Sequence, residues 1–320
     1  MTSPIPYPGE IIALATAAMW AACSLMFAAA GRRVGAFAVN QIRIAIAVCL
    51  LVPTHLIVFG TFFPTGLSGS HLLLLAISGA IGLALGDFFY FGCLVMLGAQ
   101  LGMLVMSTWP IFAALLAWIF LGDSLNWAAW CGIAITLAGV GWVVLERKPN
   151  ADNSHSHKHV LLGTLVGTLG ALGQAAGYVM MRPLMKLQDG RPVVNALSGT
   201  LVRMTVAMII VWLVALCAGR MKKTFSAAKD RGALAMTGGG AFTGPFIGVW
   251  LSLAALHFIS PGVSGALMAT APVLIIPMVV VVHKERPSPR AILGAIVAVC
   301  GVSVIFLRDD IARILASWVG

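Results

Sequence analysis

The run "GMLVMSTWPIFAALLAWIFLGD" (102–123) is apolar over almost its whole length and carries one proline. A helix needs roughly 20 apolar residues to cross about 30 Å of hydrocarbon, and this run has that length. A second run, "SGALMATAPVLIIPMVVVVHKE" (264–285), aligns with the first without a gap when Pro272 is placed over Pro110. We interpret the two runs as copies of one membrane-spanning helix.

The correspondence extends beyond the two runs. The same spacing sets three further pairs of residues together: Asp123 with Glu285, Gly132 with Gly294, and Gly139 with Gly301. Arg43 and Arg203, each a lone arginine in an apolar run, also occupy comparable positions in the two halves. A match in this order indicates an internal repeat.

The composition agrees with a chain built from such helices. Hydrophobic residues make up 60% of the 320 positions and charged residues only 9%, which excludes a soluble globular domain. The apolar runs are continuous, whereas strands of a membrane β-barrel alternate apolar and polar residues. We therefore predict an all-α membrane protein with ten transmembrane helices, at 11–30, 38–60, 71–95, 99–121, 127–146, 160–181, 194–217, 233–256, 261–283 and 289–307.

One polar stretch, "ERKPNADNSHSHKH" (146–159), separates the first five predicted helices from the last five. We expect a first five-helix repeat at 1–148, a polar linker at 149–159 and a second five-helix repeat at 160–320. Because five is an odd number, the second repeat must enter the membrane from the opposite side. Transporters with such inverted repeats bind substrate near the middle of the membrane, so we expect a central cavity where the repeats meet.

The chain resembles the ten-helix EamA-type permeases of the drug/metabolite transporter superfamily. The resemblance rests on Arg43, on "GAQLGMLVMSTWPIFAALLAWIFLGD" (98–123) followed by "GIAITLAGVGWVVL" (132–145), and on the second-half equivalent ending in "HKERPSPRAILGAIVAVCGVSVIFL" (283–307). It implies a basket of ten helices around a cavity, and export or uptake of small metabolites such as amino acids. Family members often have Glu before the proline of the fourth helix, where this chain has Trp109 and Ala271.

Asp87 is the one carboxylate of the predicted third helix, within "LALGDFFYFGC" (83–93). A charged side chain at mid-membrane costs ~2.5–3.5 kcal/mol on insertion scales, so it is expected to face a cavity or a partner. Two interpretations remain open. Asp87 binds a substrate ammonium group or carries a proton, or it forms a structural pair, for example with Arg43.

Arg43 and Arg203 lie in equivalent predicted helices of the two halves. A guanidinium group can hold a substrate carboxylate through two parallel hydrogen bonds, so Asp87 and one arginine would together bind a zwitterion. The alternative is that both arginine side chains extend to the lipid headgroups, since each lies near the start of its apolar run.

Polar and aromatic side chains at helical spacing are further candidates for the cavity. Residues three or four positions apart share one face of a helix, as Asp87 and Tyr90 do. By this reasoning the other candidate substrate-binding residues are Trp20 and Ser24 in the first helix, Gln100 and Ser107 in the fourth, and Gln174 and Tyr178 in the sixth. Each is also consistent with hydrogen bonding between packed helices.

Pro110 and Pro272 lie inside predicted spans at equivalent positions of the two halves. A proline removes one backbone hydrogen bond and bends a helix, which a membrane protein tolerates where neighbouring groups satisfy the freed carbonyl. We interpret these two prolines as candidate hinges, and a fixed bend is the alternative.

These features favour secondary transport. We predict that the protein moves a small organic metabolite, an amino acid or related compound, out across a bacterial inner (plasma) membrane by alternating access. The expected partners are the substrate and membrane lipid, with a proton as a candidate coupled ion, and the expected state is a monomer or weak homodimer. We expect no cofactor, metal or nucleic acid, because no Walker A motif is present and the basic residues are scattered over short loops.

Two other functions remain open. His155, His157 and His159 in the polar linker are of a type that binds zinc, so a metal-ion carrier is the alternative function. Such a carrier would need paired ligands within the membrane, where Asp87 stands alone. A membrane enzyme acting on lipid would need a second polar group near Asp87. The predicted spans contain no nucleophile–base pair, so we expect no enzymatic activity.

Two arguments differ on the orientation in the membrane. Ten spans place both termini on one side. If that side is cytoplasmic, the outer loops carry thirteen of the 20 lysines and arginines and the cytoplasmic segments five, against the positive-inside rule. One miscounted helix would reverse this count of loop charges. The family resemblance implies cytoplasmic termini, and we follow it, because its loop pattern covers more of the chain.

Overall fold

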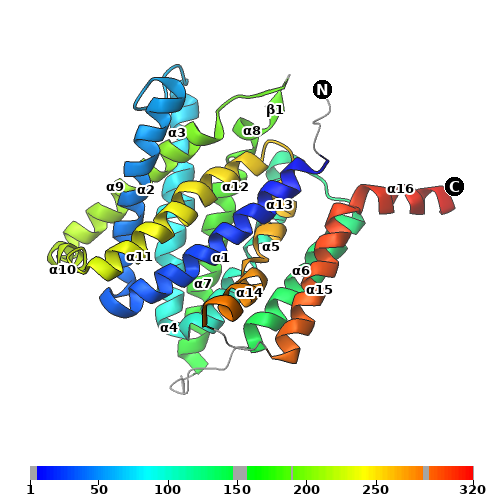
Figure 1. Cartoon of the computed structure of the whole chain (residues 1–320). Coiled ribbons are helices and arrows are strands. Elements are labelled where there is room, and N and C mark those ends of the chain that lie inside the picture. Colours follow the sequence, from blue (N-terminus) through cyan, green and yellow to red (C-terminus); the bar gives the residue numbers. More distant parts are fainter. Residues whose placement is uncertain (1–5, 147–156, 189, 284–287, 320) are drawn as a thin grey trace.

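The computed structural model describes residues 6–146, 157–188, 190–283 and 288–319. These residues are almost entirely helical (Figure 1). The first half contains the helices α1 (Pro8–Val34), α2 (Ala36–Phe59), α3 (Gly69–Gly79), the π-helix η1 (Ala80–Leu85), α4 (Gly86–Met106), α5 (Trp109–Leu121) and α6 (Trp127–Glu146).

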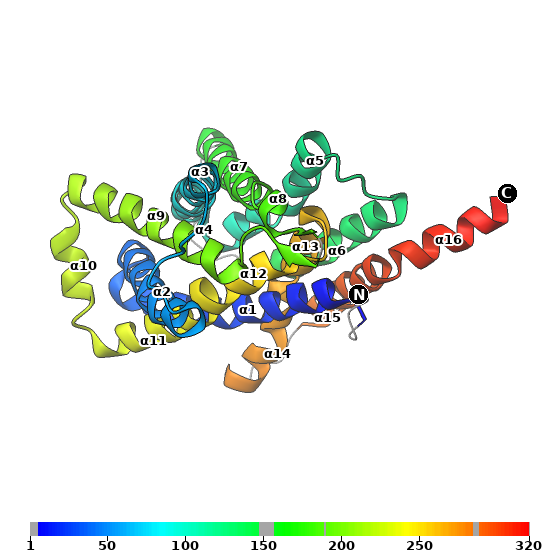
Figure 2. The same cartoon turned by 90° about the horizontal axis from the view of Figure 1, so that it is seen from above.

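The second half follows a similar order with additional short elements. It contains α7 (His157–Val179), α8 (Arg182–Met185), α9 (Ala196–Cys217), α10 (Met221–Ala227), α11 (Arg231–Ala241), the π-helix η2 (Phe242–Gly248), α12 (Val249–Ala255), α13 (Pro261–Met268), α14 (Ala271–His283), α15 (Pro289–Phe306) and α16 (Arg308–Val319). A small antiparallel hairpin of β1 (Leu187–Gln188) and β2 (Arg191–Pro192) precedes α9. Seen from above, α16 extends away from the bundle (Figure 2).

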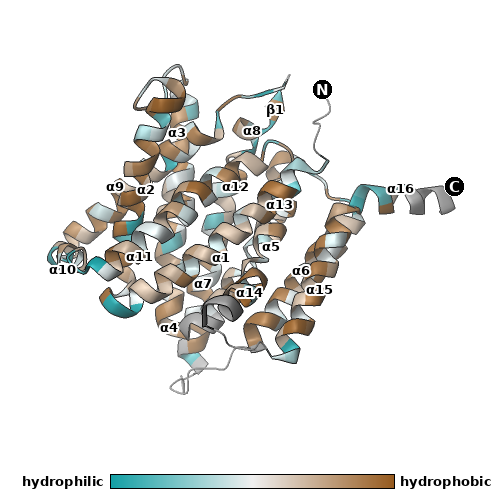
Figure 3. Cartoon of the chain, viewed as in Figure 1, coloured by the Kyte–Doolittle hydropathy of each residue, from teal (hydrophilic) through white to brown (hydrophobic). Residues whose placement is uncertain are grey.

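Nine helical segments of the described chain are long and apolar enough to cross a membrane. Hydrophobic residues cover these helices along most of their length (Figure 3). The segment predicted as the eighth span, 233–256, is not among the nine. It is built from α11, η2 and α12 in succession, and the glycines of Gly238–Gly240 make it less apolar than the other helices.

The fifth helices of the two halves, α6 and α15, pack against each other in opposite directions. A Cβ atom at Gly132 would lie 2.7 Å from Ile305, whereas one at Gly139 would lie 2.3 Å from the backbone nitrogen of Ala298. Positions further along α6 therefore meet positions earlier in α15. Since these helices are equivalent in the repeat, the two halves are inverted relative to each other, and small residues allow the close approach.

The third helix of each half contains a π-helical turn. η1 lies between α3 and α4, and η2 lies between α11 and α12, at the spacing that relates Pro110 to Pro272. π-helical turns are rare and occur frequently at functional sites, because the wider turn redirects the side chains that follow it. Those side chains include Asp87 after η1 and Val249 after η2.

The fourth helix of each half is interrupted at equivalent positions. In the first half, α4 extends over the end of the third predicted span and the start of the fourth, and it ends at Met106 before α5 begins at Trp109. In the second half, α13 ends at Met268 before α14 begins at Ala271. Pro110 and Pro272 are each the second residue of the new helix, where the missing N–H takes no part in the helical hydrogen bonds. The chain is thus interrupted at both prolines, and their role as hinges stays a prediction.

Candidate functional site

A pocket of about 290 Å³ lies between the two repeats. Most of the candidate site residues line it, namely Trp20, Ser24, Arg43, Asp87, Tyr90, Ser107, Gln174, Tyr178, Arg203 and Pro272. We call it the inter-repeat pocket. Its volume is close to the lower end of the range for small-molecule sites, roughly 300–1,000 Å³, which suits a metabolite of amino-acid size.

Among the candidate site residues with a described side chain, Pro110 does not belong to this lining. Pro110 is buried in the first turn of α5, where it packs against α13, 3.2 Å from the Cβ position of Gly265. Gln100 belongs to α4, and its side chain lies outside the described residues.

Asp87, in the first turn of α4, accepts hydrogen bonds through both carboxylate oxygens. Arg43 donates from Nη2 to Oδ2, and Gln174 donates from Nε2 to Oδ1 at 3.1 Å. Arg43 also donates from Nε to Asn40 Oδ1 at 2.9 Å, and its guanidinium lies 5.6 Å from the ring centroid of Phe91. The structural pair considered above as one interpretation of Asp87 is therefore present.

The pair compensates both charges within the pocket. Arg43 and Asp87 are each 8% exposed, so the arginine does not extend to the headgroups and that interpretation of Arg43 is wrong. The desolvation of two buried charges is offset when they attract each other and their remaining polar atoms are hydrogen-bonded. A carboxylate already paired in this way is a weak ligand for a substrate ammonium group.

Arg203, the second arginine of the pocket, has no such partner. It is 3% exposed, which also rules out an extended position at the headgroups. Within the described chain it forms no ion pair, and its Nε has no hydrogen-bond partner. Its Nη2 donates a long hydrogen bond, 3.4 Å, to the carbonyl oxygen of Gly177.

Tyr178 lies at the end of the pocket nearer the chain termini. Its hydroxyl donates to the carbonyl oxygen of Ser252 at 2.7 Å and shares a hydrogen bond with Ser264 Oγ at 2.8 Å. Its ring meets Trp109 edge to face, 5.6 Å between centroids. Tyr178 thus connects α7 to α12 and α13 of the second repeat and to α5 of the first.

Beyond Tyr178, the two repeats are joined by a buried arginine. Nε of Arg182 lies 3.5 Å from Oδ2 of Asp123, and its Nη1 donates to the carbonyl oxygen of Leu256. At the same end α5 and α13 are in direct contact, because a Cβ atom at Gly262 would lie 2.5 Å from Cβ of Ala114. The repeats are therefore closely packed at this end.

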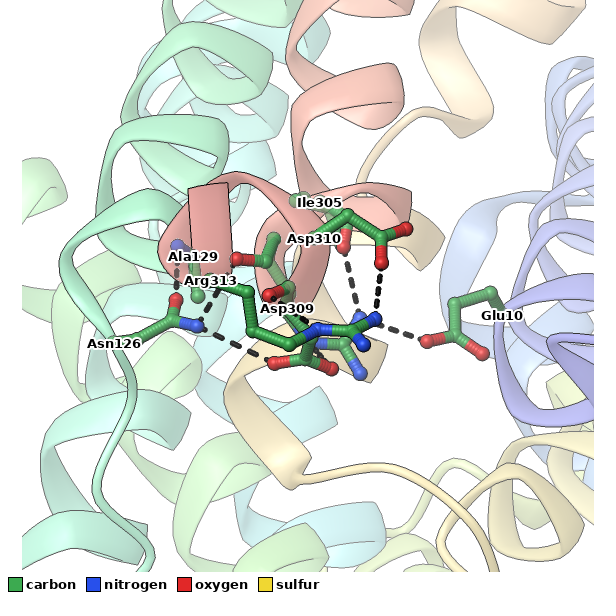
Figure 4. A network of polar contacts seen from close by, with 8 residues as sticks. Glu10, Asn126, Ala129, Ile305, Asp309, Asp310 and Arg313 are labelled. Carbon is green, nitrogen blue, oxygen red and sulfur yellow. Dashed lines mark hydrogen bonds and ion pairs between the residues drawn. The ribbon is translucent and has the colours of Figure 1, made fainter. Parts of the chain in front are cut away.

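A second ion pair joins the repeats near both chain termini. Arg308, at the start of α16, donates from Nη1 to Glu10 Oε1 at 2.7 Å. Asn126 donates to the carbonyl oxygen of Arg308 at 3.2 Å and caps α6 by accepting from the backbone N–H of Ala129 (Figure 4). These contacts tie α1, α6 and the start of α16 together.

At the opposite end, polar contacts between the repeats involve α1 and α2. Asp230 lies 3.1 Å from Arg33 and caps α11 by accepting from the backbone N–H of Ala233 at 2.9 Å. These hydrogen bonds, that of Ala233 first, lower the pKa of the partly buried Asp230 carboxyl. Gln41 accepts a hydrogen bond from Thr224. None of these residues lines the inter-repeat pocket.

Sequence reasoning missed the apolar part of the lining. Met204 and Ile275, for example, are apolar residues in apolar helices, and no local signal separates them from residues that face lipid. The repeat supplies a usable signal, because many lining residues are repeat-related pairs: Leu83 with Pro245, Asp87 with Val249, Met106 with Met268, Ser107 with Ala269, and Trp109 with Ala271.

Nothing in the described chain supports the metal-ion carrier. Its residues contain no group of three or more His, Cys, Asp or Glu that could hold a metal ion. His155 and the side chains of His157 and His159 lie outside the described residues.

Comparison with known families gives a match to both repeats. The model of the EamA-like transporter family matches residues 7–145 and 161–307. The chain belongs to this family. This EamA-like transporter is accordingly a multi-pass membrane protein of the drug/metabolite transporter type, and its family implies a small-molecule substrate.

The fold of this EamA-like transporter also occurs in a solved structure titled "Crystal structure of protein". The two chains share 21% identity with a TM-score of 0.73, over 97% of this chain and 99% of the other. A likeness at this identity shows the fold alone. No curated protein matches the chain.

Proposed function

We propose that this EamA-like transporter is a secondary transporter that exports a small organic metabolite, an amino acid or related compound, by alternating access through the inter-repeat pocket. The observation that carries the proposal is that the pocket lies between the repeats and holds Arg43, Asp87 and Arg203. Charges are expensive within membrane helices and mark substrate pathways there. The proposed setting is the bacterial inner membrane, with ten crossings, of which α11, η2 and α12 form the eighth.

The inverted repeats support alternating access. The ion pairs of Arg182 and Arg308 hold one end of the bundle closed. An inverted repeat supplies an equivalent of each element at the other end, so the same packing can in principle form there instead. The breaks before Pro110 and Pro272 lie beside the pocket, and we propose that the fourth and ninth helices rotate about them.

Purified protein in liposomes tests the transport function. We expect exchange of at least one labelled organic solute from a panel of amino acids and their acylated derivatives, and no movement of Mn²⁺ or of fluorescent lipid above that in empty liposomes. Exchange of Mn²⁺ without any organic solute would contradict the proposal in favour of the metal-ion carrier. Lipid movement alone would favour an activity on lipid.

Proton coupling is tested at Asp87. If this carboxylate carries the coupled proton, Asp87→Asn transports at a rate that no longer depends on an imposed pH gradient. Because the substitution also leaves Arg43 unpaired, the double variant Arg43→Gln/Asp87→Asn is measured beside it. Unchanged transport by Asp87→Asn, with and without the gradient, would remove the carboxylate from the mechanism.

A further inference from the structure

We infer that the substrate of the inter-repeat pocket carries one net negative charge and that Arg203 binds its carboxylate. This inference rests on the proposed function and specifies the substrate class: a small organic anion with an apolar body. It differs from the zwitterion expected from the sequence, since Asp87, the carboxylate of the described lining, is already paired with Arg43.

The charges of the pocket leave one positive charge uncompensated. Among the described residues that line it, three are of a charged type: Arg43, Asp87 and Arg203. Arg43 and Asp87 are paired. Arg203, 3% exposed, has no carboxylate within reach of an ion pair in the described chain. A lone buried charge is costly, and a bound anion would offset that cost.

The repeat shows where a compensating carboxylate is missing. Arg203 is the equivalent of Arg43, and Val249 occupies the position equivalent to Asp87. Val249 follows η2 as Asp87 follows η1, and both residues line the pocket. The second repeat thus has the arginine of the first repeat without its carboxylate, so the two halves differ in charge at equivalent places.

The guanidinium of Arg203 has donors to offer. Its Nε is buried without a hydrogen-bond partner, and the hydrogen bond from its Nη2 to the carbonyl oxygen of Gly177 is long, 3.4 Å. The side chain lies against glycines, because a Cβ atom at Gly82 would be 3.4 Å from Nη2. A planar guanidinium can give two parallel hydrogen bonds to a carboxylate, which are stronger than those between neutral groups.

The remaining lining selects for an apolar body. Trp20, Phe91, Trp109 and several methionines border the pocket. Asp87 attracts an ammonium group less than a lone carboxylate would, because Arg43 compensates its charge and both of its oxygens already accept a hydrogen bond, from Arg43 and from Gln174. An acylated, keto or hydroxy acid fits this chemistry better than the corresponding amino acid.

A matched set of four leucine derivatives tests the inference: N-acetylleucine is an anion, leucine a zwitterion, N-acetylleucinamide neutral and, at about pH 6.5, leucinamide mostly a cation. Binding to the purified full chain is followed by tryptophan fluorescence, since Trp20 and Trp109 line the pocket. We expect the anion to bind tightest, the zwitterion next, and the other two weakly.

Two substitutions test whether Arg203 causes this order of affinities. Arg203→Gln should lower the affinity for N-acetylleucine by about tenfold or more, the size of a lost charged hydrogen bond, and leave N-acetylleucinamide within about twofold. Val249→Asp keeps Arg203 but adds the missing negative charge, and should weaken anion binding similarly. Val249→Asn, which matches Val249→Asp in shape but adds no charge, is the reference, and N-acetylleucine should bind it about tenfold more tightly than it binds Val249→Asp.

Separate readouts distinguish the outcomes. If the neutral or cationic derivative binds as tightly as the anion, or if Arg203→Gln keeps its anion affinity, the inference is wrong. Binding of the anion that needs Arg203, without exchange in liposomes, would uphold the site and overturn the transport function. Exchange of N-acetylleucinamide that is independent of Arg203 would uphold the transport function and overturn the proposed role of Arg203.

Discussion

The ion pair between Arg43 and Asp87 places two opposite charges inside membrane helices. Each charge offsets part of the desolvation cost of the other. Each is 8% exposed, and Gln174 and Asn40 satisfy further polar atoms of the pair. Removing one partner leaves the other buried and unpaired, which is far more costly than removing both. The stability of the protein should therefore depend on the charges together.

This dependence gives a prediction for Asp87→Asn. We expect it to lower the free energy of unfolding by about 3 kcal/mol, because Arg43 is left as a lone charge. The double variant Arg43→Gln/Asp87→Asn should recover much of the loss. Thermal unfolding in detergent measures both, and a double variant less stable than Asp87→Asn would contradict this account.

At the scale of elements, glycines decide how closely helices of different repeats approach. On α6, Gly139 faces α15, and a Cβ atom there would lie 2.3 Å from the nitrogen of Ala298 and 2.7 Å from the carbonyl oxygen of Gly294. Gly141, two residues further on, would place its Cβ 3.6 Å from the nearest atom, Cδ1 of Leu104. The two positions therefore differ in the space available for a side chain, although both lie on α6.

We predict that Gly139→Ala destabilises the protein, because backbone atoms of α15 cannot yield to the added methyl group. Gly141→Ala is the matched control, and should be neutral or slightly stabilising, since alanine is favoured over glycine in a helix by about 1 kcal/mol. Thermal unfolding compares them. Equal unfolding temperatures would mean that α6 and α15 pack less closely than described.

For the whole molecule, alternating access requires the closed end to open. Ala114 on α5 and Gly262 on α13 are in contact there. The side chains of Glu10 and Arg308 also meet at this end. We expect Glu10→Cys/Arg308→Cys, joined by a short bis-methanethiosulfonate cross-linker, to stop solute exchange in liposomes, and a reducing agent to restore it. Each single variant is the control. Full exchange by the cross-linked protein would show that this end need not open.

The arrangement of loop charges also belongs to the whole molecule. Many of the basic residues lie at the helix ends opposite the chain termini, in agreement with the loop charges counted from the sequence. They are Arg32, Arg33, Lys158 and the basic residues of 220–231. If the chain crosses the membrane ten times, as proposed, the positive-inside rule predicts that this face is cytoplasmic and that the termini are outside. Alkaline phosphatase fused to the C-terminus should be active, and fluorescent protein fused there should be dark. The opposite pattern would support the orientation implied by the family.

The sequence alone determined the features that depend on one segment or on its repetition. Apolar length predicts a membrane helix because hydrocarbon thickness is fixed. The pairing of Pro110 with Pro272 located both helix breaks, and the lone charges at Arg43, Asp87 and Arg203 marked the lining of the pocket. These signals are local, and no knowledge of packing is needed to read them.

Only the tertiary structure decided which charges meet. Hydropathy and spacing do not set the rotation of each helix about its axis or its neighbours across the repeat. Packing places Arg43 beside Asp87, and it places Arg203 against Gly177, where no carboxylate of the described residues forms an ion pair with it. The same packing brings Met268 to the pocket. A charged residue in a membrane helix predicts a partner of opposite charge, and the fold determines whether the protein or the substrate supplies that partner.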